Sequence, residues 1–418
     1  MAGSATAAGG AGTGTPVAAG GNPFQLVTNL YAEKNNTGST TSYTVTASQS
    51  GPQGGQVNAG NFLRRVNLIL RTTTIGTTAT GATVSDMPWN VFTGVDMVNV
   101  DGSEILYTMG GYAHYLVQKY GRPWLGDPAQ WQDAANSTAS LPQCTLPLMP
   151  EIRWTAGVLA NTDTRSQYRI DYIIDSMTNY IQSGTTNTTG APIVNVQPYL
   201  DAWAQPDATD LQGTPNQPVP PGLNLQNKRR HQIFSLNSAS DNILQSALTG
   251  NALRLQILVI RSGAAPSNTR YDGVTDPLTW QLDNRSLGKY SSGSRLLSST
   301  TTLVNGTTVI NTGGDMLNQR ATDFYDEYFA TSPIINNNTT NSPLIATAYA
   351  TFTRDIGVYV FPRFLKPGTL YGEGWLYTAN STKEIFEFTA TTLTSGTAEL
   401  ITDEVYPVGP VDPSLTDI

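Results

Sequence analysis

The stretch that best indicates the fold covers residues 64–71 and reads Arg-Arg-Val-Asn-Leu-Ile-Leu-Arg. Val66, Leu68 and Leu70 occupy every second position in it, which is the period of a half-buried β-strand. Residues 253–260, Leu-Arg-Leu-Gln-Ile-Leu-Val-Ile, repeat that period in the second half of the chain. The sequence therefore predicts strands in both halves, each with one face against a core.

Other segments carry the same signal, and they cover residues 95–100, 104–109, 168–175, 358–365, 371–378 and 384–389. Asp101-Gly102 between two of them predicts a two-residue hairpin, because a type I′ turn needs positive φ. Asn99, Asp101 and Gly102 also match part of a calcium loop. The first and twelfth positions of that loop would be Met97 and Thr108, which lack the required carboxylates. The hairpin is therefore the favoured interpretation.

Helices are few. Residues 109–120 place Tyr112, Tyr115, Leu116 and Lys119 on one helical face, and Gly121 ends the pattern. A second helix is predicted to begin at Asp315 and to end before Ser332-Pro333. Its apolar face is formed by Leu317, Ala321, Phe324 and Tyr328. The chain is thus predicted to be mainly β, with one helix in each half.

The length of 418 residues is comfortable for two domains. Residues 205–224 are predicted to be a stiff linker, because they contain five prolines: Pro206, Pro215, Pro218, Pro220 and Pro221. Residues 1–40 are predicted to be a flexible Gly/Ala-rich arm. The remaining boundaries place the first β-domain at residues 41–204 and the second, with a C-terminal tail, at 225–418.

Charged residues make up 13% of the chain, and the net charge is -8. Binding to nucleic acid needs clustered Lys and Arg. The one dense basic run, Lys228-Arg229-Arg230-His231, is interpreted as the solvated start of a strand rather than as such a site. Direct nucleic-acid binding is therefore not expected. The single cysteine, Cys144, cannot form an intrachain disulfide and is interpreted as a small apolar residue.

No constellation of residues predicts catalysis. The two histidines, His114 and His231, match no zinc motif, and His114 is interpreted as structural. Asp323, Asp326 and Glu327 could serve a glycosidase, but their i, i+3, i+4 spacing fits a solvated helix face. Glu373 is an isolated candidate. The chain is therefore predicted not to be an enzyme, with no catalytic, cofactor-binding or metal-binding residue assigned and no cofactor expected.

Several segments together resemble a known family in their order along residues 45–400. They are Phe62 to Val66, the hairpin around Asp101-Gly102 with the helix at residues 110–114 that follows it, residues 157–161 and 167–170, residues 198–201, residues 233–244 and 253–261, and residues 370–377. This order resembles the major coat protein of tectiviruses, tailless phages with an internal membrane. That family belongs to the double jelly-roll lineage, which includes the adenovirus hexon. The Gly/Ala-rich N-terminus departs from the family pattern.

The resemblance implies an all-β fold of two tandem eight-stranded jelly rolls with a few short helices and an extended N-terminal arm. It also implies a homotrimer that forms a pseudo-hexagonal capsomer and tiles an icosahedral shell around an internal membrane and a double-stranded DNA genome. Its partners would be neighbouring capsomers, minor capsid or vertex proteins, and the membrane through residues 1–40. The protein would be made in the host cytoplasm and located in the virion. Residues 299–315 and 332–343 have no obvious counterpart in the family, and they are predicted to form outward loops because loops tolerate length at sheet ends.

Three alternatives remain open from sequence. A phage tail or spike protein would also be β-rich and trimeric, although fibrous repeats are not evident. The capsid fold of tailed phages needs a long helix, and the longest helical pattern here is about 15 residues. A lectin or carbohydrate-active tandem sandwich would need an aromatic platform beside paired carboxylates, and Trp124 and Trp131 supply only the aromatics.

Overall fold

A computed structural model gives the fold. The residues that it describes are 25–27, 41–44, 51–57, 61–74, 86, 89–100, 105–121, 143–152, 157–163, 165, 167–174, 193–204, 225–263, 269–270, 274–290, 300–302, 308–310, 357–363, 375–390 and 393–407. The predicted second helix, the proline-rich segment at residues 205–224, Asp101-Gly102, Asp323 to Glu327 and Glu373 lie outside these residues.

The first half of the chain contains ten strands, a 3-10 helix and an α-helix among the described residues. In chain order they are β1 (Gln25–Val27), β2 (Thr41–Thr44), β3 (Gly51–Gln56), β4 (Asn61–Thr74), η1 (Trp89–Val91), β5 (Phe92–Val98), β6 (Ile105–Met109), α3 (Gly111–Gly121), β7 (Gln143–Leu148), β8 (Leu159–Asn161), β9 (Arg169–Ile174) and β10 (Ile193–Ala204).

The second half consists of strands over its described residues. They are β11 (Leu225–Ser235), β12 (Asp241–Ser246), β13 (Ala252–Ser262), β14 (Thr269–Arg270), β15 (Val274–Leu282), β16 (Arg285–Tyr290), β17 (Thr300–Thr302), β18 (Thr308–Ile310), β19 (Val358–Pro362), β20 (Leu376–Tyr377), β21 (Glu384–Ala390) and β22 (Thr397–Pro407). The small hairpin of β17 and β18 pairs only within itself.

Strand pairing shows that each half is a jelly roll. In the second half, one sheet has the order β11-β22-β13-β19 and the other has the order β12-β21-β15-β16. The eight strands in these two orders are β11, β12, β13, β15, β16, β19, β21 and β22. If they are numbered 1 to 8 along the chain, the orders become 1-8-3-6 and 2-7-4-5. In the first half, β1 and β2 together take position 1 and β7 and β8 take position 6. The orders become β1/β2-β10-β4-β7/β8 and β3-β9-β5-β6, which are the same two permutations. Two Greek-key sheets of this kind define a jelly roll.

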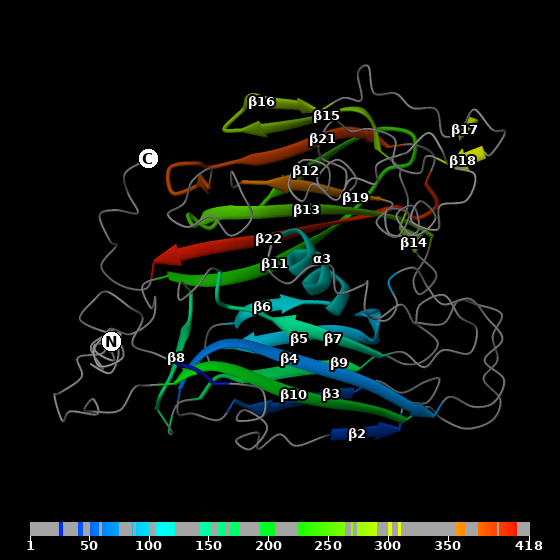
Figure 1. The fold of residues 1–418 in the computed structure, drawn as a ribbon. Helices are drawn as coiled ribbons and strands as arrows, with labels where there is room; N and C mark the ends of the chain where they lie inside the picture. The colour runs from blue at the N-terminus through cyan, green and yellow to red at the C-terminus, as the bar shows by residue number, and fades with distance from the viewer. Residues whose placement is uncertain are drawn as a thin grey trace, which may run out of the picture.

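The two rolls are joined into one structure. Strand β6, at the edge of the first roll, pairs in parallel with β11 of the second roll, so that their sheets become one sheet of ten strands. Figure 1 shows the two rolls stacked one above the other, with α3 between them. The described part of the chain contains no helix that is long and apolar enough to span a membrane. The predicted fold class, two tandem jelly rolls in a β-dominated chain, is confirmed.

Among the described residues, two large hydrophobic cores fill this arrangement, beside a small cluster of Phe62, Val158 and Trp203. The larger core contains residues of both rolls, such as Val66 of β4, Leu116 of α3 and Ile257 of β13. The smaller core lies within the second roll, around Leu258, Phe386 and Leu400. Strand β13 contributes to both, because Ile257 and Leu258 point to opposite faces of its sheet. Every residue of β13 except its last is buried.

Strands β5 and β6 pair as the predicted antiparallel hairpin, with Val98 opposite Ile105 and a register shift beside Val98. Its predicted turn, Asp101-Gly102, lies outside the described residues. The structure corrects one detail of the sequence prediction. Residues 253–260 were expected to bury one face, whereas both faces are buried because α3 and the first roll cover the second face. Within the segment expected to be an arm, residues 25–27 form β1 and pair with residues 202–204.

Candidate functional site

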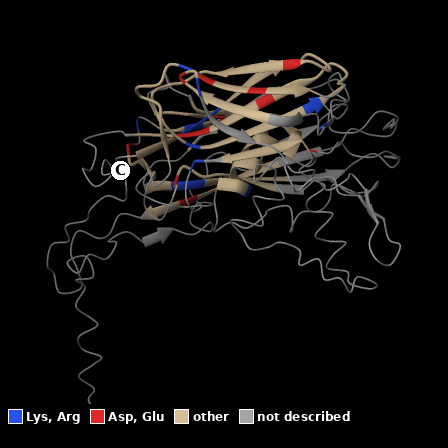
Figure 2. Ribbon diagram, turned by 90° about the horizontal axis from the view of Figure 1, so that it is seen from above, with Lys and Arg blue, Asp and Glu red and all other residues tan. Residues whose placement is uncertain are grey.

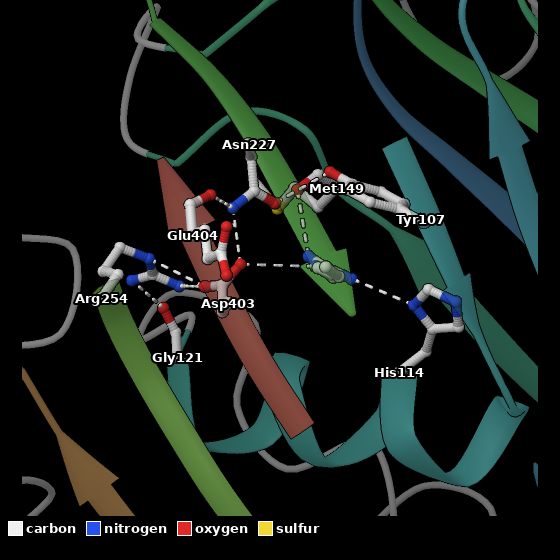
Figure 3. Close-up of polar contacts among 9 residues, drawn as sticks. Tyr107, His114, Gly121, Met149, Asn227, Arg254, Asp403 and Glu404 are labelled. Atoms are coloured by element: carbon white, nitrogen blue, oxygen red, sulfur yellow. Dashed lines mark hydrogen bonds and ion pairs between the residues drawn. The ribbon is translucent and has the colours of Figure 1, made fainter. Parts of the chain in front are cut away.

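Among the described strands, one parallel pairing joins the two rolls, that of β6 with β11. It lies beside a buried group of charged and polar residues, which we call the junction network. It consists of Tyr107, His114, Asn227, Arg229, Arg254 and Asp403, and all of its members have 1% or less of their surface exposed. Figure 3 shows that they come from both rolls and meet around β22 and β11. An ionic cluster so deep in a fold requires internal partners, because burial of an unpaired charge is costly.

Asp403 is the centre of the junction network. Its Oδ2 accepts a hydrogen bond of 2.9 Å from Arg254 Nε and a second one from the same guanidinium. Its Oδ1 lies 3.7 Å from Arg229 Nε and accepts a hydrogen bond from Asn227 Nδ2. The carboxylate of Asp403 on β22 therefore binds side chains of both neighbouring strands, β11 and β13. It links the three strands of the second roll that lie toward the first roll.

Arg229 carries the connection across to the first roll. Its guanidinium donates to the carbonyl oxygen of Met149 at 3.2 Å and to His114 Nδ1 at 3.3 Å. It also lies 4.5 Å from the centre of the Tyr107 ring, within the range of a cation–π contact. The Tyr107 hydroxyl in turn donates to Asn227 at 2.9 Å. Arg229 thus contacts β6, α3 and the segment that follows β7, all in the first half of the chain.

Arg254 fixes the helix between the rolls. It donates a 3.0 Å hydrogen bond to the carbonyl oxygen of Gly121, the last residue of α3. Carbonyls at the end of a helix have no partner within the helix, and a cation there also interacts favourably with the helix dipole. The end of α3 is therefore tied directly to β13.

His114 is a neutral member of the network. Burial and the nearby charge of Arg229 lower its pKa from the ordinary 6.5 to about 3. Its Nδ1 faces an arginine, which can only donate, so Nδ1 accepts and the proton resides on Nε2. Nε2–H then donates to the carbonyl oxygen of Val95 at 3.1 Å. The predicted structural role of His114 is consistent with this placement between α3, β5 and β11.

Each side of the junction has further buried ion pairs. In the second roll, Glu404 accepts from Arg230, Thr249 and Asn251. Beside α3, Asp86 pairs with Arg261 and Arg270. Burial alone would raise the pKa of Asp86, but the charges and hydrogen bonds of the two arginines outweigh it and lower that pKa. Both arginines also lie over the Tyr112 ring of α3, at 5.7 and 5.0 Å.

The interpretation of the basic run as solvated is wrong for Arg229, which is completely buried. Arg230 is bound to Glu404, and Lys228 lies 4.4 Å from the centre of the Tyr406 ring. Arg229 therefore serves internal packing, whereas Lys228, Arg230 and His231 are half-buried. Figure 2 shows acidic and basic positions intermixed along the described strands, with no stripe of one sign among them.

Sequence reasoning did not identify Arg254 or Asp403. The available signal was a charge inside an apolar strand, since Arg254 interrupts the 253–260 run and Asp403 precedes Glu404-Val405. Among the described residues, no group of three or more His, Cys, Asp or Glu side chains is placed to bind a metal. Because the junction network is closed to solvent, it can fix the relation of the two rolls but cannot meet a substrate.

Comparison with known proteins adds a likeness in structure only. No family model and no curated protein sequence matches the chain. A quasi-atomic model of the PBCV-1 virus capsid aligns with a TM-score of 0.52 at 10% identity, over 92% of this chain and 94% of that one. A crystal structure of PBCV-1 VP54 fitted into a reconstruction of the virophage Sputnik gives 0.50 at 9% identity, over 93% and 95%.

The major capsid protein of bacteriophage PM2 aligns over 89% of this chain and 98% of that one, with a TM-score of 0.41 at 10% identity. At such low identities a likeness of structure concerns the fold. Both PBCV-1 comparisons span nearly the whole of each chain, so both rolls are included. The chain therefore has the double jelly-roll fold that is found in the PBCV-1 capsid.

Proposed function

We propose that this chain is the major coat protein of an icosahedral virus, and that three copies form a pseudo-hexagonal capsomer. The observation that carries the proposal is the double jelly-roll fold shared with the PBCV-1 capsid over almost the full length of both chains. A building block of this kind acts through its shape and its edges, so its function needs no reactive side chain. The virion is the corresponding location.

The junction network supports this function physically. A tile in a shell must present its edges at fixed relative positions, because each contact is repeated many times by symmetry. Arg229 and Arg254, which are both neutralised by Asp403, donate hydrogen bonds from the second roll to the carbonyl oxygens of Met149 and Gly121 in the first half of the chain. Hydrogen bonds from a charged donor are strong and directional. The ten-stranded sheet adds a continuous backbone connection between the rolls. The chain therefore behaves as one rigid double unit.

The oligomeric state tests the proposal. We expect purified protein to have a mass in light scattering of three times the 44.8 kDa of one chain. Negative-stain images of the same sample should show particles with a six-sided outline. A monomer that persists over a wide range of protein concentration would contradict the proposal. Contacts of residues 1–40 with an internal membrane, and contacts with minor vertex proteins, stay predictions of the sequence.

A further inference from the structure

A row of polar side chains crosses the outer face of the ten-stranded sheet in the first roll. Asp171 of β9 lies directly opposite Asp96 of β5, and Asp96 in turn lies opposite Thr108 of β6. Successive residues of a strand point to opposite faces, so the row faces away from the buried Val95 and Tyr107. Asp96 and Asp171 are half-buried, and Thr108 is exposed. Two carboxylates therefore lie side by side on a surface that water reaches.

The two carboxylates differ in their partners. Asp171 accepts a 2.7 Å hydrogen bond from Nε of the exposed Arg169, two positions earlier on the same strand. Asp96 is hydrogen-bonded by the uncharged side chain of Thr108. Like charges directly opposite each other in a sheet are destabilising. The pairing of β5 with β9 therefore includes a repulsive contact whenever both carboxyls are ionised.

The described strands on either side add little compensating charge. On β3, Gly54 lies opposite Asp171 and has no side chain. On β11, Arg230 lies opposite Thr108, but its guanidinium is bound by Glu404 of the second roll. The repulsion between the two carboxylates is therefore not cancelled from these strands.

The environment of Asp96 favours its protonated form. Burial raises the pKa of the Asp96 carboxyl above the ordinary 3.8, and the charge of Asp171 raises it further. The hydrogen bond from Thr108 and the charge of His231 lower this pKa, and the net shift is upward. His231 belongs to β11, and its Nδ1 donates to the carbonyl oxygen of Thr108 at 3.1 Å. The second roll thus contributes to the environment of the pair.

We propose that the row of Asp171, Asp96 and Thr108 is a proton-sensitive element of the fold, which weakens the pairing of β5 with β9 in neutral solution and strengthens it when Asp96 takes up a proton from the solvent. A protonated carboxyl donates one hydrogen bond, and the ionised Asp171 is an acceptor directly opposite. Proton uptake thus replaces a repulsion with a hydrogen bond. Strand β5 also pairs with β6, which joins β11 of the second roll, so the element lies beside the connection between the rolls.

The direction of the pH effect follows from the shift of the Asp96 pKa. The unfolded chain releases this proton near the ordinary 3.8, whereas the folded chain holds it to higher pH. Its contribution to stability is therefore fully present below pH 3.8 and is lost as the pH rises through the folded pKa of Asp96. The element lies within one folded chain, so its test does not require an assembled shell.

The variant Asp96→Asn tests the proposal on the full chain. Asparagine keeps an acceptor for Thr108 and removes the charge, as a bound proton does. At pH 8 we expect the folding equilibrium constant of the variant to exceed that of the wild type by about two- to fivefold. This gain should shrink as the pH is lowered toward 4, where the wild-type carboxyl is protonated. Urea titrations at a fixed protein concentration measure both constants. A gain that is independent of pH, or a loss of stability at pH 8, overturns the proposal.

A second variant shows whether the pair of carboxylates is the cause. Asp171→Asn removes the other charge, so adding Asp96→Asn to it should give no further stabilisation at pH 8. Equal gains in both backgrounds would mean that Asp171 is not involved, and the proposal would be wrong. The matched control is Asp163→Asn, because Asp163 forms an exposed pair with Arg165. It should show no gain that depends on pH.

Hydrogen exchange at pH 8 locates the effect in the fold. Peptides that cover residues 92–98 and 169–174 should exchange more slowly in Asp96→Asn than in the wild type, because these residues form the paired strands β5 and β9. Unchanged exchange in both peptides would contradict the proposed strengthening of this pairing.

Discussion

At the scale of single residues, Asp403 is the carboxylate around which the junction network is built. It neutralises Arg254 and Arg229, which in turn contact α3 and the first roll. Neither arginine has solvent to stabilise its charge, so the network depends on this carboxylate. Removing one partner of a buried ion pair leaves an uncompensated charge, which costs far more than the net value of the pair.

We therefore expect Asp403→Asn to lower the free energy of unfolding by about 3–5 kcal/mol. Asparagine keeps the shape of the side chain and removes only its charge. The matched control is Asp163→Asn, because Asp163 and Arg165 form an exposed pair at 3.6 Å. Its effect should stay within about 0.5 kcal/mol. Urea titrations of the two variants and the wild type measure the difference, and equal midpoints for both variants would contradict the assigned role.

His114 predicts a dependence of stability on pH. Its pKa is about 3 in the folded chain and 6.5 in an ordinary environment, so the unfolded chain takes up this proton first as the pH falls. The contribution of neutral His114 to the free energy of unfolding is constant above pH 6.5, and it is lost as the pH falls from 6.5 to about 3. It changes the folding equilibrium by up to about tenfold per pH unit. Unfolding titrations across that window should show a shallower slope for His114→Gln than for the wild type, and parallel curves would rule out this role.

At the scale of elements, α3 shows which features can be predicted from the sequence and which depend on the tertiary structure. The predicted helix at residues 109–120 is confirmed to within two residues, since its Gly121 stop and aromatic spacing are local signals. The expected single buried face is not what the structure shows, because all eleven residues are buried. Even Lys119 is 2% exposed and lies 5.5 Å from the ring centres of Tyr115 and Tyr120. When a helix is buried on all sides, its stability depends on how closely neighbouring segments pack against its ends.

Gly111 provides a test of that close approach. A Cβ at this position would collide with the carbonyl oxygen of Trp89 and lie 2.9 Å from Phe92 Cβ. We expect Gly111→Ala to destabilise the fold by about 1–3 kcal/mol, because the backbone of η1 cannot move aside freely. Gly94→Ala is the control, since its Cβ would meet only Ile173 Cδ1 at an ordinary 3.5 Å. Thermal unfolding should separate the two variants, and similar melting temperatures would show that α3 can shift.

At the scale of the whole molecule, the larger core prevents the rolls from being independent. It contains residues from the first roll, from α3 and from the second roll in a single cluster. Strands β13, β19 and β22 each supply residues to this core and to the smaller one. Loss of the first roll would expose apolar side chains such as Ile257 and Val360 on the surface of the second roll, which is unfavourable.

The rolls should therefore unfold together. Differential scanning calorimetry at a fixed protein concentration should give one transition that includes both halves. Intrinsic tryptophan fluorescence should change over the same temperatures, because buried tryptophans such as Trp203 and Trp280 lie in different rolls. Two resolved transitions would show that the shared core and the junction network couple the rolls only weakly.

The sequence by itself determined the β class, the positions of most strands and the helix in the first half. These depend on local patterns: the period of two in residues 64–71 and a glycine at the end of a helical stripe. It could not determine that both faces of β13 are buried, or that Arg229 lies inside the protein. Arg254 and its partner Asp403 are 149 positions apart, and no local pattern relates two such residues. Only the tertiary structure decided the junction between the rolls, because it arises where two separately patterned halves meet.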